Sequence, residues 1–316
     1  MKKKILITGA SGFVGTNLIN ALKKDKKFLL FGTYFKNRPK YTKNVKYFQA
    51  DLTKKKDCFR VLKNIDYVFN CSAITSGASD IQKKPLIHLT PNVIINCSLL
   101  ESAYENNVKK FIFISSNTVY PLSKKAMKES DAKYNFFEKY FIVGWMKKFS
   151  EIMCEMYSLR IKKKMQTIIV RPGNLFGPYD KFDEEKSKVI PALIKKVLES
   201  KGEVKVWGDG NDLKDFLYID DFIDGLIKLL KVSKIFSIYN LAMGKSYKIK
   251  KILELILSIE KKKNFNVKYD LTKPTMIPFR NISISKIKSE LNWKPKISLK
   301  EGLLRTIIWY KRNYNK

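Results

Sequence analysis

The fold is decided near the start of the chain, by Lys4-Ile5-Leu6-Ile7-Thr8-Gly9-Ala10-Ser11-Gly12-Phe13-Val14-Gly15. The apolar run at 5–7 predicts a buried strand, and residues 14–22 predict a helix. Three glycines at three-residue spacing join them, as a sharp turn requires if a phosphate is to touch the backbone. The helix start adds free N–H groups and a partial positive charge, which favour a pyrophosphate. We therefore predict a dinucleotide site made by Gly9, Ser11, Gly12, Phe13, Val14 and Gly15.

The composition is that of a folded globular protein. The chain has 316 residues, of which 45% are hydrophobic, and this length suits one or two domains. Its basic and apolar start imitates a signal peptide, but glycines interrupt the apolar run, and no stretch approaches the roughly 18 apolar residues of a membrane span. Four scattered cysteines and a single histidine predict neither a disulfide framework nor a metal site. We expect a cytoplasmic protein without membrane insertion.

The net charge of +34 does not by itself name a partner. Nucleic acid, an acidic membrane surface and small anionic ligands all attract basic chains. Only seven of the 63 basic residues are arginines, however, and the lysines are spread over the whole chain. Nucleic-acid binders more often gather arginines and aromatic residues on one face. We expect no nucleic-acid partner, because a general lysine bias explains the charge.

Strand and helix patterns alternate through the first half of the chain at the pace of βαβ units. Predicted strands lie at 4–8, 28–34, 45–49, 67–71, 110–115 and 166–171, and a strand at 236–242 returns to the same sheet. The remainder mixes shorter helices and strands. We therefore predict an α/β fold: a Rossmann-type doubly wound parallel sheet in residues 1–172, completed by strand 236–242. Residues 173–316 then form a smaller α+β C-terminal lobe that mainly binds substrate.

The end of the second predicted strand bears on which dinucleotide is bound. Folds selective for NAD place an acid there, against the ribose hydroxyls. Here the segment reads Gly32-Thr33-Tyr34-Phe35-Lys36-Asn37-Arg38, without an acid. Thr33, Lys36 and Arg38 could instead bind a 2′-phosphate, which a carboxylate would repel. NADP(H) is therefore the preferred cofactor and NAD(H) the alternative.

Several motifs together carry a family resemblance. They are residues 8–15, Asp51-Leu52, Ser115-Ser116-x-x-Val119-Tyr120, Arg171-Pro172-Gly173-Asn174-Leu175-Phe176-Gly177-Pro178, Trp207-Gly208-Asp209-Gly210 and Asp215-Phe216-Leu217-Tyr218. The chain resembles the extended short-chain dehydrogenases/reductases that act on nucleotide sugars, and within them the GDP-L-fucose synthase branch. The resemblance implies an NAD(P)-dependent epimerase or 4-keto-sugar reductase that acts on a GDP-linked hexose in surface polysaccharide synthesis. It also implies that the cofactor lies along Asp51, Leu52, Cys71, Ser72, Ala73, Asn92, Ser115, Lys147, Pro172, Asn174 and Leu175.

The resemblance further implies a catalytic Ser-Tyr-Lys set, in which the tyrosine exchanges a proton with the sugar oxygen. The lysine lowers the pKa of that tyrosine, and the serine binds the same oxygen. Ser116 and Lys147 match the serine and the lysine, because Cys154-Glu155-x-Tyr157 follows Lys147 as in the family pattern. The tyrosine position is then Val143, which cannot transfer a proton. Tyr140, two helical turns before Lys147, is the best substitute donor, although an ordinary packed tyrosine explains it equally well.

Two further departures concern the other sugar carbons. Fucose synthases use a cysteine and a histidine to move protons at C3 and C5, and here Thr118 and Lys188 stand in their places. Epimerisation by the same means is therefore not expected, although a lysine can act as a base if its pKa falls. Asn117-Thr118 also lacks the carboxylates that related 4,6-dehydratases use, so dehydration is not expected.

The remaining candidates would hold the substrate. Asn174 suits the sugar or the diphosphate, Lys214 and Arg280 suit the diphosphate, and Trp207 suits stacking on a base. Lys188 and Val189, at the start of a predicted helix, complete the set. Solvated charges for Lys214 and Arg280, and a core position for Trp207, are the plainer alternatives.

Two functions remain open from the sequence. One is the epimerase or reductase with an altered proton donor. The other is a non-catalytic protein that binds NAD(P) or a nucleotide sugar, which Val143 favours. In either case the helices predicted at 91–106 and 143–159 resemble those that pair two subunits in this family, so we expect a homodimer.

Overall fold

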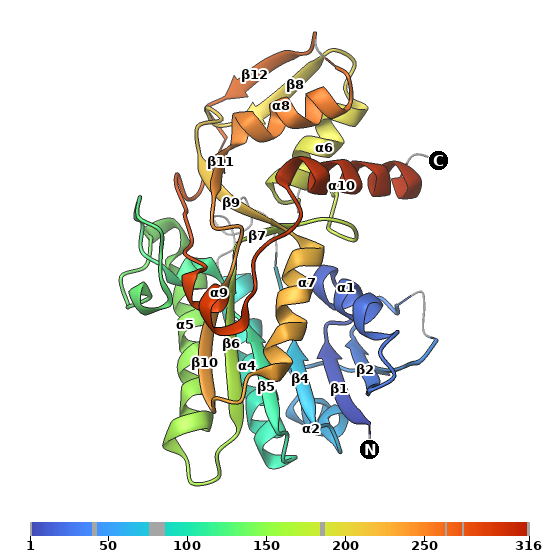
Figure 1. Ribbon diagram of the computed structural model, residues 1–316, viewed down its shortest axis with the longest axis vertical. Coiled ribbons are helices and arrows are strands. Elements are labelled where there is room, and N and C mark those ends of the chain that lie inside the picture. Colours follow the sequence, from blue (N-terminus) through green and yellow to red (C-terminus); the bar gives the residue numbers. More distant parts are fainter. Residues whose placement is uncertain are drawn as a thin grey trace.

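The computed structural model describes residues 2–39, 43–75, 86–183, 187–262, 264–273 and 275–314. Its centre is a parallel sheet of seven strands in the order β10-β6-β5-β4-β1-β2-β3 (Figure 1). The strands are β1 (Lys3–Thr8), β2 (Phe28–Tyr34), β3 (Val45–Gln49), β4 (Tyr67–Asn70), β5 (Lys110–Ile114), β6 (Gln166–Pro172) and β10 (Phe236–Leu241). Each matches a predicted strand to within one residue at either end. The predicted doubly wound parallel sheet is confirmed.

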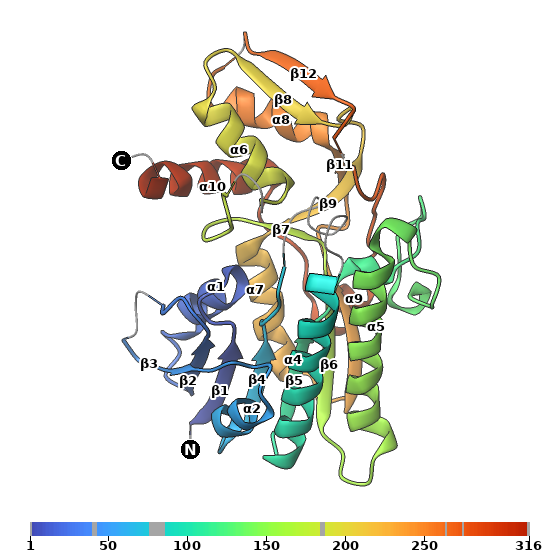
Figure 2. The same cartoon turned by 180° about the vertical axis from the view of Figure 1, so that it is seen from behind.

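Helices cover both faces of this sheet, which is why its strands read as nearly continuous apolar runs. Figure 1 shows one face, with α1 (Phe13–Leu22) and α7 (Ile219–Lys228) in front of it. Figure 2 shows the other face, covered by α2 (Lys55–Leu62), α4 (Leu86–Glu105) and α5 (Phe141–Glu155).

The two long helices α4 and α5 differ from their predicted bounds. The predicted helix at 91–106 begins at Pro91. In the structure Pro91 lies inside α4, which the described residues already show at Leu86, so the helix tolerates the loss of one backbone hydrogen bond. α5 begins two residues before its predicted start and passes at Met156–Arg160 into a π-helical turn.

A smaller α+β lobe stands above the carboxyl ends of the strands (Figure 1). Its strands form two small sheets, β11-β9-β7 and β12-β8. They are β7 (Asn174–Phe176), β8 (Glu203–Trp207), β9 (Leu213–Tyr218), β11 (Ser246–Lys248) and β12 (Asn266–Asp270), and the helices are α6 (Val189–Glu199), α8 (Ile249–Ile259) and α10 (Leu299–Tyr314). The short α9 (Ser285–Leu291) instead packs against β10. The division of the chain at residue 172 stays a prediction.

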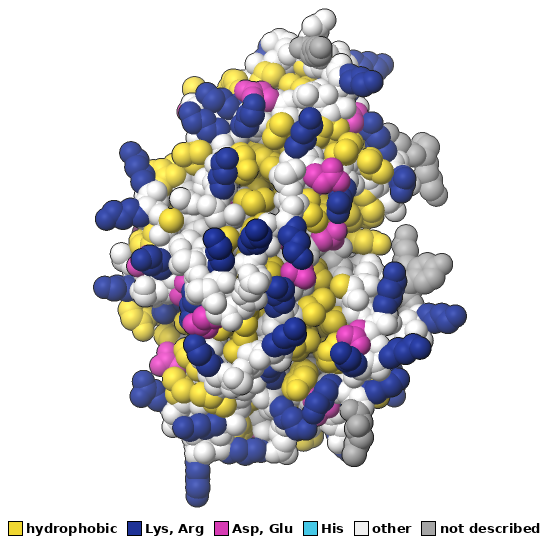
Figure 3. Space-filling model, viewed as in Figure 1, with side chains coloured by type: hydrophobic (Ala, Val, Ile, Leu, Met, Phe, Trp, Pro, Cys, Tyr) yellow, Lys and Arg dark blue, Asp and Glu magenta, His cyan; other side chains and the backbone are white. Residues whose placement is uncertain are grey.

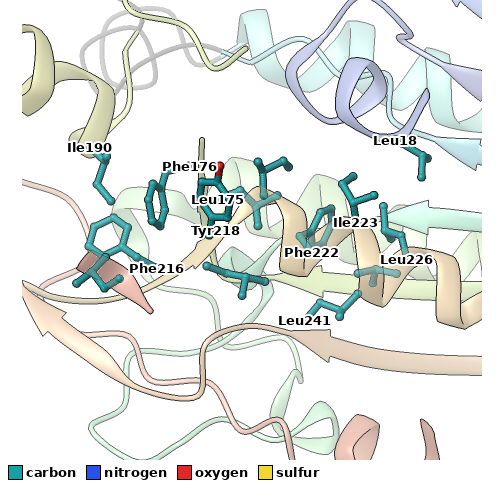
Figure 4. Packing of buried hydrophobic residues seen from close by; sticks show 14 of the residues in the cluster. Leu18, Leu175, Phe176, Ile190, Phe216, Tyr218, Phe222, Ile223, Leu226 and Leu241 are labelled. Carbon is teal, nitrogen blue, oxygen red and sulfur yellow. The ribbon is translucent and has the colours of Figure 1, made fainter. Parts of the chain in front are cut away.

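The lobe and the sheet share one apolar core. Figure 4 shows Phe176 and Tyr218 of the lobe strands near Phe222 and Leu226 of α7, and all four belong to one cluster of buried side chains. The same cluster reaches Leu18 in α1. The lobe and the main domain are therefore joined by a continuous apolar contact.

The surface and the described side chains give three further facts. Lys and Arg side chains are scattered over the face seen in Figure 3 and do not gather in one patch. None of the described helices combines the length and hydrophobicity that crossing a bilayer requires. Within the part of the chain that the structure describes, no group of His, Cys, Asp and Glu side chains is arranged to hold a metal ion.

Candidate active site

The glycine-rich loop forms a tight turn between β1 and α1. Gly9 has a φ of +60°, which glycine adopts without strain, and a Cβ there would lie 3.0 Å from the Cys71 carbonyl oxygen. A Cβ on Gly15 would overlap the Gly9 carbonyl oxygen. α1 begins at Phe13 with no side-chain cap from the described residues and no acid in its first turn. Its first N–H groups can therefore bind a phosphate, and this cradle fits the pyrophosphate of NAD(P).

Thr33, at the end of β2, is hydrogen-bonded to this loop. Its side chain is buried, its hydroxyl accepts a hydrogen bond from the Gly9 N–H (3.2 Å), and its carbonyl accepts one from the Ala10 N–H (2.8 Å). Its short side chain is engaged by the adjacent turn, and its predicted contact with a ribose phosphate stays a prediction. Lys36 and Arg38 are exposed just beyond β2 and remain candidates.

The ends of β3 and β4 carry the next cofactor candidates. Asp51 is half-buried, and one of its carboxylate oxygens accepts hydrogen bonds from the N–H and the hydroxyl of Thr53 (3.1 and 2.6 Å). After β4, the Ser72 hydroxyl donates to the Asn70 amide oxygen (2.7 Å), which ties this loop to the strand end. Among the other candidates here, Leu52 is buried, Cys71 is half-buried and Ala73 is exposed.

Asn92 shapes the loop that follows β4. Its amide nitrogen donates to the carbonyls of Ile74 (3.0 Å) and His88 (2.7 Å), and its amide oxygen accepts from the Ile74 N–H (2.9 Å). The side chain is buried, and both ends of its amide are occupied by the backbone. Asn92 therefore holds the backbone of this loop, and its predicted contact with the cofactor stays a prediction.

Ser116 and Lys147 both lie at the carboxyl end of β5. Ser116 precedes a short 3₁₀ turn (Asn117–Val119), and its hydroxyl oxygen accepts hydrogen bonds from the N–H (3.2 Å) and the hydroxyl (2.9 Å) of Thr118. α5 packs directly on this turn, since a Cβ on Gly144 would lie 2.8 Å from the Thr118 carbonyl oxygen. Lys147 donates from Nζ to the carbonyl of Ile114 (2.9 Å). The fold thus brings the predicted serine and lysine to one strand end.

The environment of Lys147 disfavours its charge. Burial lowers the pKa of its ammonium group to about 8, and the Glu151 carboxylate opposes that shift. The ammonium nitrogen lies 5.0 Å from the centre of the Phe113 ring. Lys147 can therefore exist as an amine or as an ammonium ion near neutral pH.

Val143 and Tyr140 precede Lys147 on the same chain segment. Val143 stands one helical turn before Lys147, so this face of α5 offers no hydroxyl there. Tyr140 is the residue before the helix and has non-helical φ and ψ of −121° and 15°. Burial raises the pKa of Tyr140 to about 12, against the opposing charge of Arg280. Its role as a substitute donor stays a prediction.

A buried ion pair behind the site was missed by sequence reasoning. Arg171 in β6 donates from Nε and Nη2 to the two carboxylate oxygens of Glu151 (2.9 and 2.7 Å), and the side chains are 1% and 2% exposed. The Ser115 hydroxyl donates to the same carboxylate (2.6 Å). The side chain of Ser115 therefore faces the interior, and its predicted contact with the cofactor stays a prediction. The position of Glu151 one turn after Lys147 is the signal that could have found it.

Lys188 of the lobe lies beside the glycine-rich loop. Its Nζ is 5.0 Å from the centre of the Phe13 ring and 3.7 Å from Oδ1 of Asp180. Asp180 is buried, burial raises its pKa, and its Oδ2 has no hydrogen-bond partner in the described part of the chain. Val189, half-buried, begins α6 directly after Lys188.

Lys214 and Arg280 lie close enough for their positive charges to repel each other. Both cations donate hydrogen bonds to other groups of the protein. Lys214 donates from Nζ to the Asp212 carboxylate (3.1 Å) and the Ile277 carbonyl (2.9 Å). Arg280 is 1% exposed and donates to the carbonyls of Tyr120 and Pro121 (3.2 and 2.8 Å), while its Nε has no partner among the described residues. Arg280 is therefore not a solvated surface charge.

The remaining substrate candidates are placed by β6, β7 and β8. Pro172 accepts a hydrogen bond on its carbonyl from Asn117 (2.9 Å), and Leu175 is buried. The Asn174 amide nitrogen donates to the Asp215 carbonyl (3.0 Å). Trp207 is 41% exposed, with the ammonium groups of Lys196 and Lys273 5.5 and 6.0 Å from its ring, so it is not a core residue.

Asp215 is a second residue that sequence reasoning did not single out for a role. Its carboxylate is fully buried and accepts hydrogen bonds from the N–H groups of Met243 (2.8 Å) and Gly244 (2.9 Å). Burial raises the pKa of this carboxyl to about 7. A Cβ on Gly173 would lie 2.9 Å from its Oδ1, so Asp215 fixes the point where the lobe strands leave the main sheet.

Known proteins place this arrangement in a family. Residues 5–242 match the model of the NAD dependent epimerase/dehydratase family. The chain belongs to the NAD-dependent epimerase/dehydratase family. This confirms the predicted membership and class of enzyme.

Relatives cover nearly the whole epimerase/dehydratase chain. It is 32% identical over 98% of its length to a putative GDP-L-fucose synthase 2 of Arabidopsis thaliana, of which 92% is covered. It is 29% identical over 99% of its length to GDP-mannose 3,5-epimerase of the same plant, of which 83% is covered. The structure of UDP-glucuronic acid 4-epimerase from Bacillus cereus, solved with UDP-glucuronic acid and NAD, matches with a TM-score of 0.86 at 26% identity, over 98% of this chain and 100% of that one.

Proposed function

We propose that this member of the epimerase/dehydratase family uses NAD(P) to epimerise or reduce a nucleotide-linked hexose. The proposed substrate is a GDP-linked hexose or the 4-keto form of that hexose. The observation that carries the proposal is the placement of Ser116 and Lys147 at the end of β5, in the same sheet edge as the glycine-rich loop. The relatives described as a GDP-L-fucose synthase and a GDP-mannose epimerase support a GDP sugar. We propose a cytoplasmic enzyme whose product feeds surface polysaccharide synthesis.

The residues of the site divide the chemistry between them. When bound, the nicotinamide supplies the hydride acceptor or donor. The Ser116 oxygen accepts both hydrogen bonds from Thr118, so its own hydroxyl hydrogen can be donated to the sugar oxygen. Lys147 places positive charge at the same strand end, where it stabilises negative charge that develops on the oxygen.

The proposed cofactor is NADP(H) in preference to NAD(H). Lys36 and Arg38 are exposed at the end of β2, where the adenosine ribose is bound in this fold. Neither has a carboxylate partner among the described residues, and both can bind a 2′-phosphate. The glycine-rich loop would hold the pyrophosphate in either case.

The lobe is proposed to bind the nucleotide sugar in residues 173–316. Trp207 is exposed enough to stack on a base, and Asn174 is the first residue of β7, the first strand of the lobe. Lys188 lies beside Phe13 of the glycine-rich loop, which supports a contact with the sugar or its phosphate. Lys214 and Arg280 would contribute positive potential to the diphosphate from behind, since their hydrogen bonds already go to protein atoms.

We propose that two copies pair through α4 and α5. Both helices cover the face of the sheet that Figure 2 shows, and they contact each other. Large apolar side chains are exposed along them: Ile87 (42%) and Ile94 (40%) on α4, and Phe141 (46%) and Trp145 (45%) on α5. A two-fold pairing would bury these residues, and light scattering that shows a monomer would contradict it.

A product screen by mass spectrometry tests the function. Purified protein is given NADPH, NADH or no added cofactor, with GDP- and UDP-hexoses and their 4-keto-6-deoxy derivatives. A mass gain of two hydrogens identifies a reductase, and a new isomer at unchanged mass identifies an epimerase. Binding of NADP and a sugar nucleotide without any product would instead support the non-catalytic alternative, which Val143 favours.

A further inference from the structure

Tyr120 ends the short turn that carries Ser116. Its backbone N–H donates to the carbonyl of Asn117 in that turn (3.3 Å), and its side chain is fully buried. The Tyr120 ring lies between two cations, 5.1 Å from the guanidinium carbon of Arg171 and 6.0 Å from that of Arg280. Tyr120 is therefore fixed to the same turn as the hydroxyl that is proposed to contact the sugar.

The backbone after this turn holds the guanidinium group of Arg280. Nη2 of Arg280 donates to the carbonyl of Tyr120 (3.2 Å), and Nη1 donates to the carbonyl of Pro121 (2.8 Å). Two hydrogen bonds from one planar group fix its orientation as well as its position. The turn that carries Ser116 is thus bonded directly to the cation that is proposed to act on the diphosphate.

The Tyr120 hydroxyl makes a second connection to the segment that contains Arg280. It donates to Oδ1 of Asn240 (2.5 Å), and the amide nitrogen of Asn240 donates to the carbonyls of Met127 (3.1 Å) and Ser283 (3.0 Å). Ser283 also donates from its N–H to the Met127 carbonyl (2.9 Å). Since Ser283 follows Arg280 by three residues, the hydroxyl and the carbonyl of Tyr120 hold one stretch of chain at two points.

Both hydrogen-bond partners of the Tyr120 hydroxyl are themselves buried. The hydroxyl donates to Asn240 and accepts from Nη1 of Arg171 (3.2 Å), and neither of these side chains is exposed. Arg171 is in turn held by the carboxylate of Glu151. A fully buried side chain cannot touch the substrate, so any effect of Tyr120 on the reaction is exerted through the groups that it holds.

We propose that Tyr120 is a positioning residue that fixes the distance from Arg280 to Ser116, and so from the diphosphate to the reacting oxygen of the sugar. The role rests on the proposed function, in which Ser116 contacts that oxygen and Arg280 supplies charge to the diphosphate. A nucleotide sugar is held at both ends. A shift of one end against the other misplaces the reacting carbon, although each end still binds.

Tyr120→Phe tests this role, because it keeps the ring and the backbone carbonyl and removes only the hydroxyl. Turnover is measured by mass spectrometry on the substrate that the product screen identifies. Calorimetry gives the affinities for NADP and for the nucleoside diphosphate alone, GDP or UDP. We expect kcat/KM to fall at least about fivefold while both affinities stay within roughly twofold. A smaller fall in kcat/KM, or affinities that fall as much as turnover does, overturns the role.

Tyr239→Phe is the matched control. Tyr239 directly precedes Asn240 in β10, so its side chain points to the opposite face of the sheet. It is 1% exposed, and its hydroxyl donates to Oε2 of Glu290 (2.7 Å). The control therefore also removes the hydroxyl of a buried tyrosine, but far from Arg280 along the hydrogen bonds. We expect its kcat/KM to stay within roughly twofold of the wild type, and a loss equal to that of Tyr120→Phe overturns the role.

Arg280→Lys provides a second test, which also serves if Tyr120→Phe does not fold. It keeps the positive charge but replaces the planar pair of donors by one ammonium group. We expect lost turnover with unchanged affinity for the nucleoside diphosphate. The double variant should lose less than the product of the two separate losses, because both changes act on one connection. Losses that multiply, or wild-type turnover in Arg280→Lys, overturn the role.

The failure of this role is distinguishable from that of the proposed function. A wild-type protein that turns over no nucleotide sugar would refute the proposed function, and the role of Tyr120 with it. An active wild type with an equally active Tyr120→Phe variant would refute only the role of Tyr120.

Discussion

Replacing Glu151 by glutamine should destabilise the protein severely, although the change removes only one charge. The substitution leaves the Arg171 guanidinium buried at 1% exposure without its counter-charge, and it weakens the hydrogen bond from Ser115. Loss of one partner from a buried ion pair typically costs about 3–5 kcal/mol. With an unfolding entropy of roughly 2.1 cal/mol/K per residue over 316 residues, a loss of about 4 kcal/mol lowers the melting temperature by about 6 °C.

Thermal and urea unfolding, followed by circular dichroism, measure this loss. Glu155→Gln, one turn further along α5, is the matched control, because Glu155 is 40% exposed and pairs loosely with the exposed Arg160. It should change the free energy of unfolding by less than about 0.5 kcal/mol. The double variant Glu151→Leu with Arg171→Met should recover much of the stability lost in Glu151→Gln, since no charge stays buried. A Glu151→Gln protein within about 1 kcal/mol of the wild type, or a double variant that loses the sum of its single changes, would refute this reasoning.

The other predictions concern the cofactor and the proton donor. Gly15→Ala should abolish NADP binding measured by calorimetry while the protein stays folded, because its Cβ would push the Gly9 carbonyl out of the turn; retained affinity would show that the loop can relax. Lys36→Ala combined with Arg38→Ala should weaken NADP binding about tenfold or more and leave NAD binding unchanged, since only the 2′-phosphate loses its charge-assisted bonds; an equal loss for both would refute the preference. Tyr140→Phe should remove turnover while NADP binding is unchanged, because Tyr140 is the expected substitute proton donor; unchanged turnover would exclude that role.

Sequence reasoning succeeded where a local pattern determines the structure. The strands of the main sheet are covered on both faces, so their apolar runs stand out and their ends are marked by Gly9 and Pro172. The glycine-rich loop was equally accessible, because its glycines are required by the turn itself. Membership of the family followed from motifs that span the chain.

Sequence reasoning failed where a side chain's partner comes from another element. Thr33 and Ser115 were predicted to contact the cofactor, and the sequence did not reveal that their hydroxyls bond within the protein, to the Gly9 N–H and the Glu151 carboxylate. Glu151 was assigned no role, because its arginine partner comes from the neighbouring β6. Such assignments depend on distances across the sheet, which no local spacing encodes.

The apolar core that runs from the main sheet into the lobe limits how this enzyme can be recombined. A chain cut after residue 172 would lose β10, and β6 would become an open edge. It would also lose α7, so that Leu18 and the face of α1 around it would be left in water. The nucleotide-binding half is therefore not a transferable module. Exchange of specificity between relatives would have to proceed through the loops at the strand ends, with the lobe and the sheet inherited as one piece.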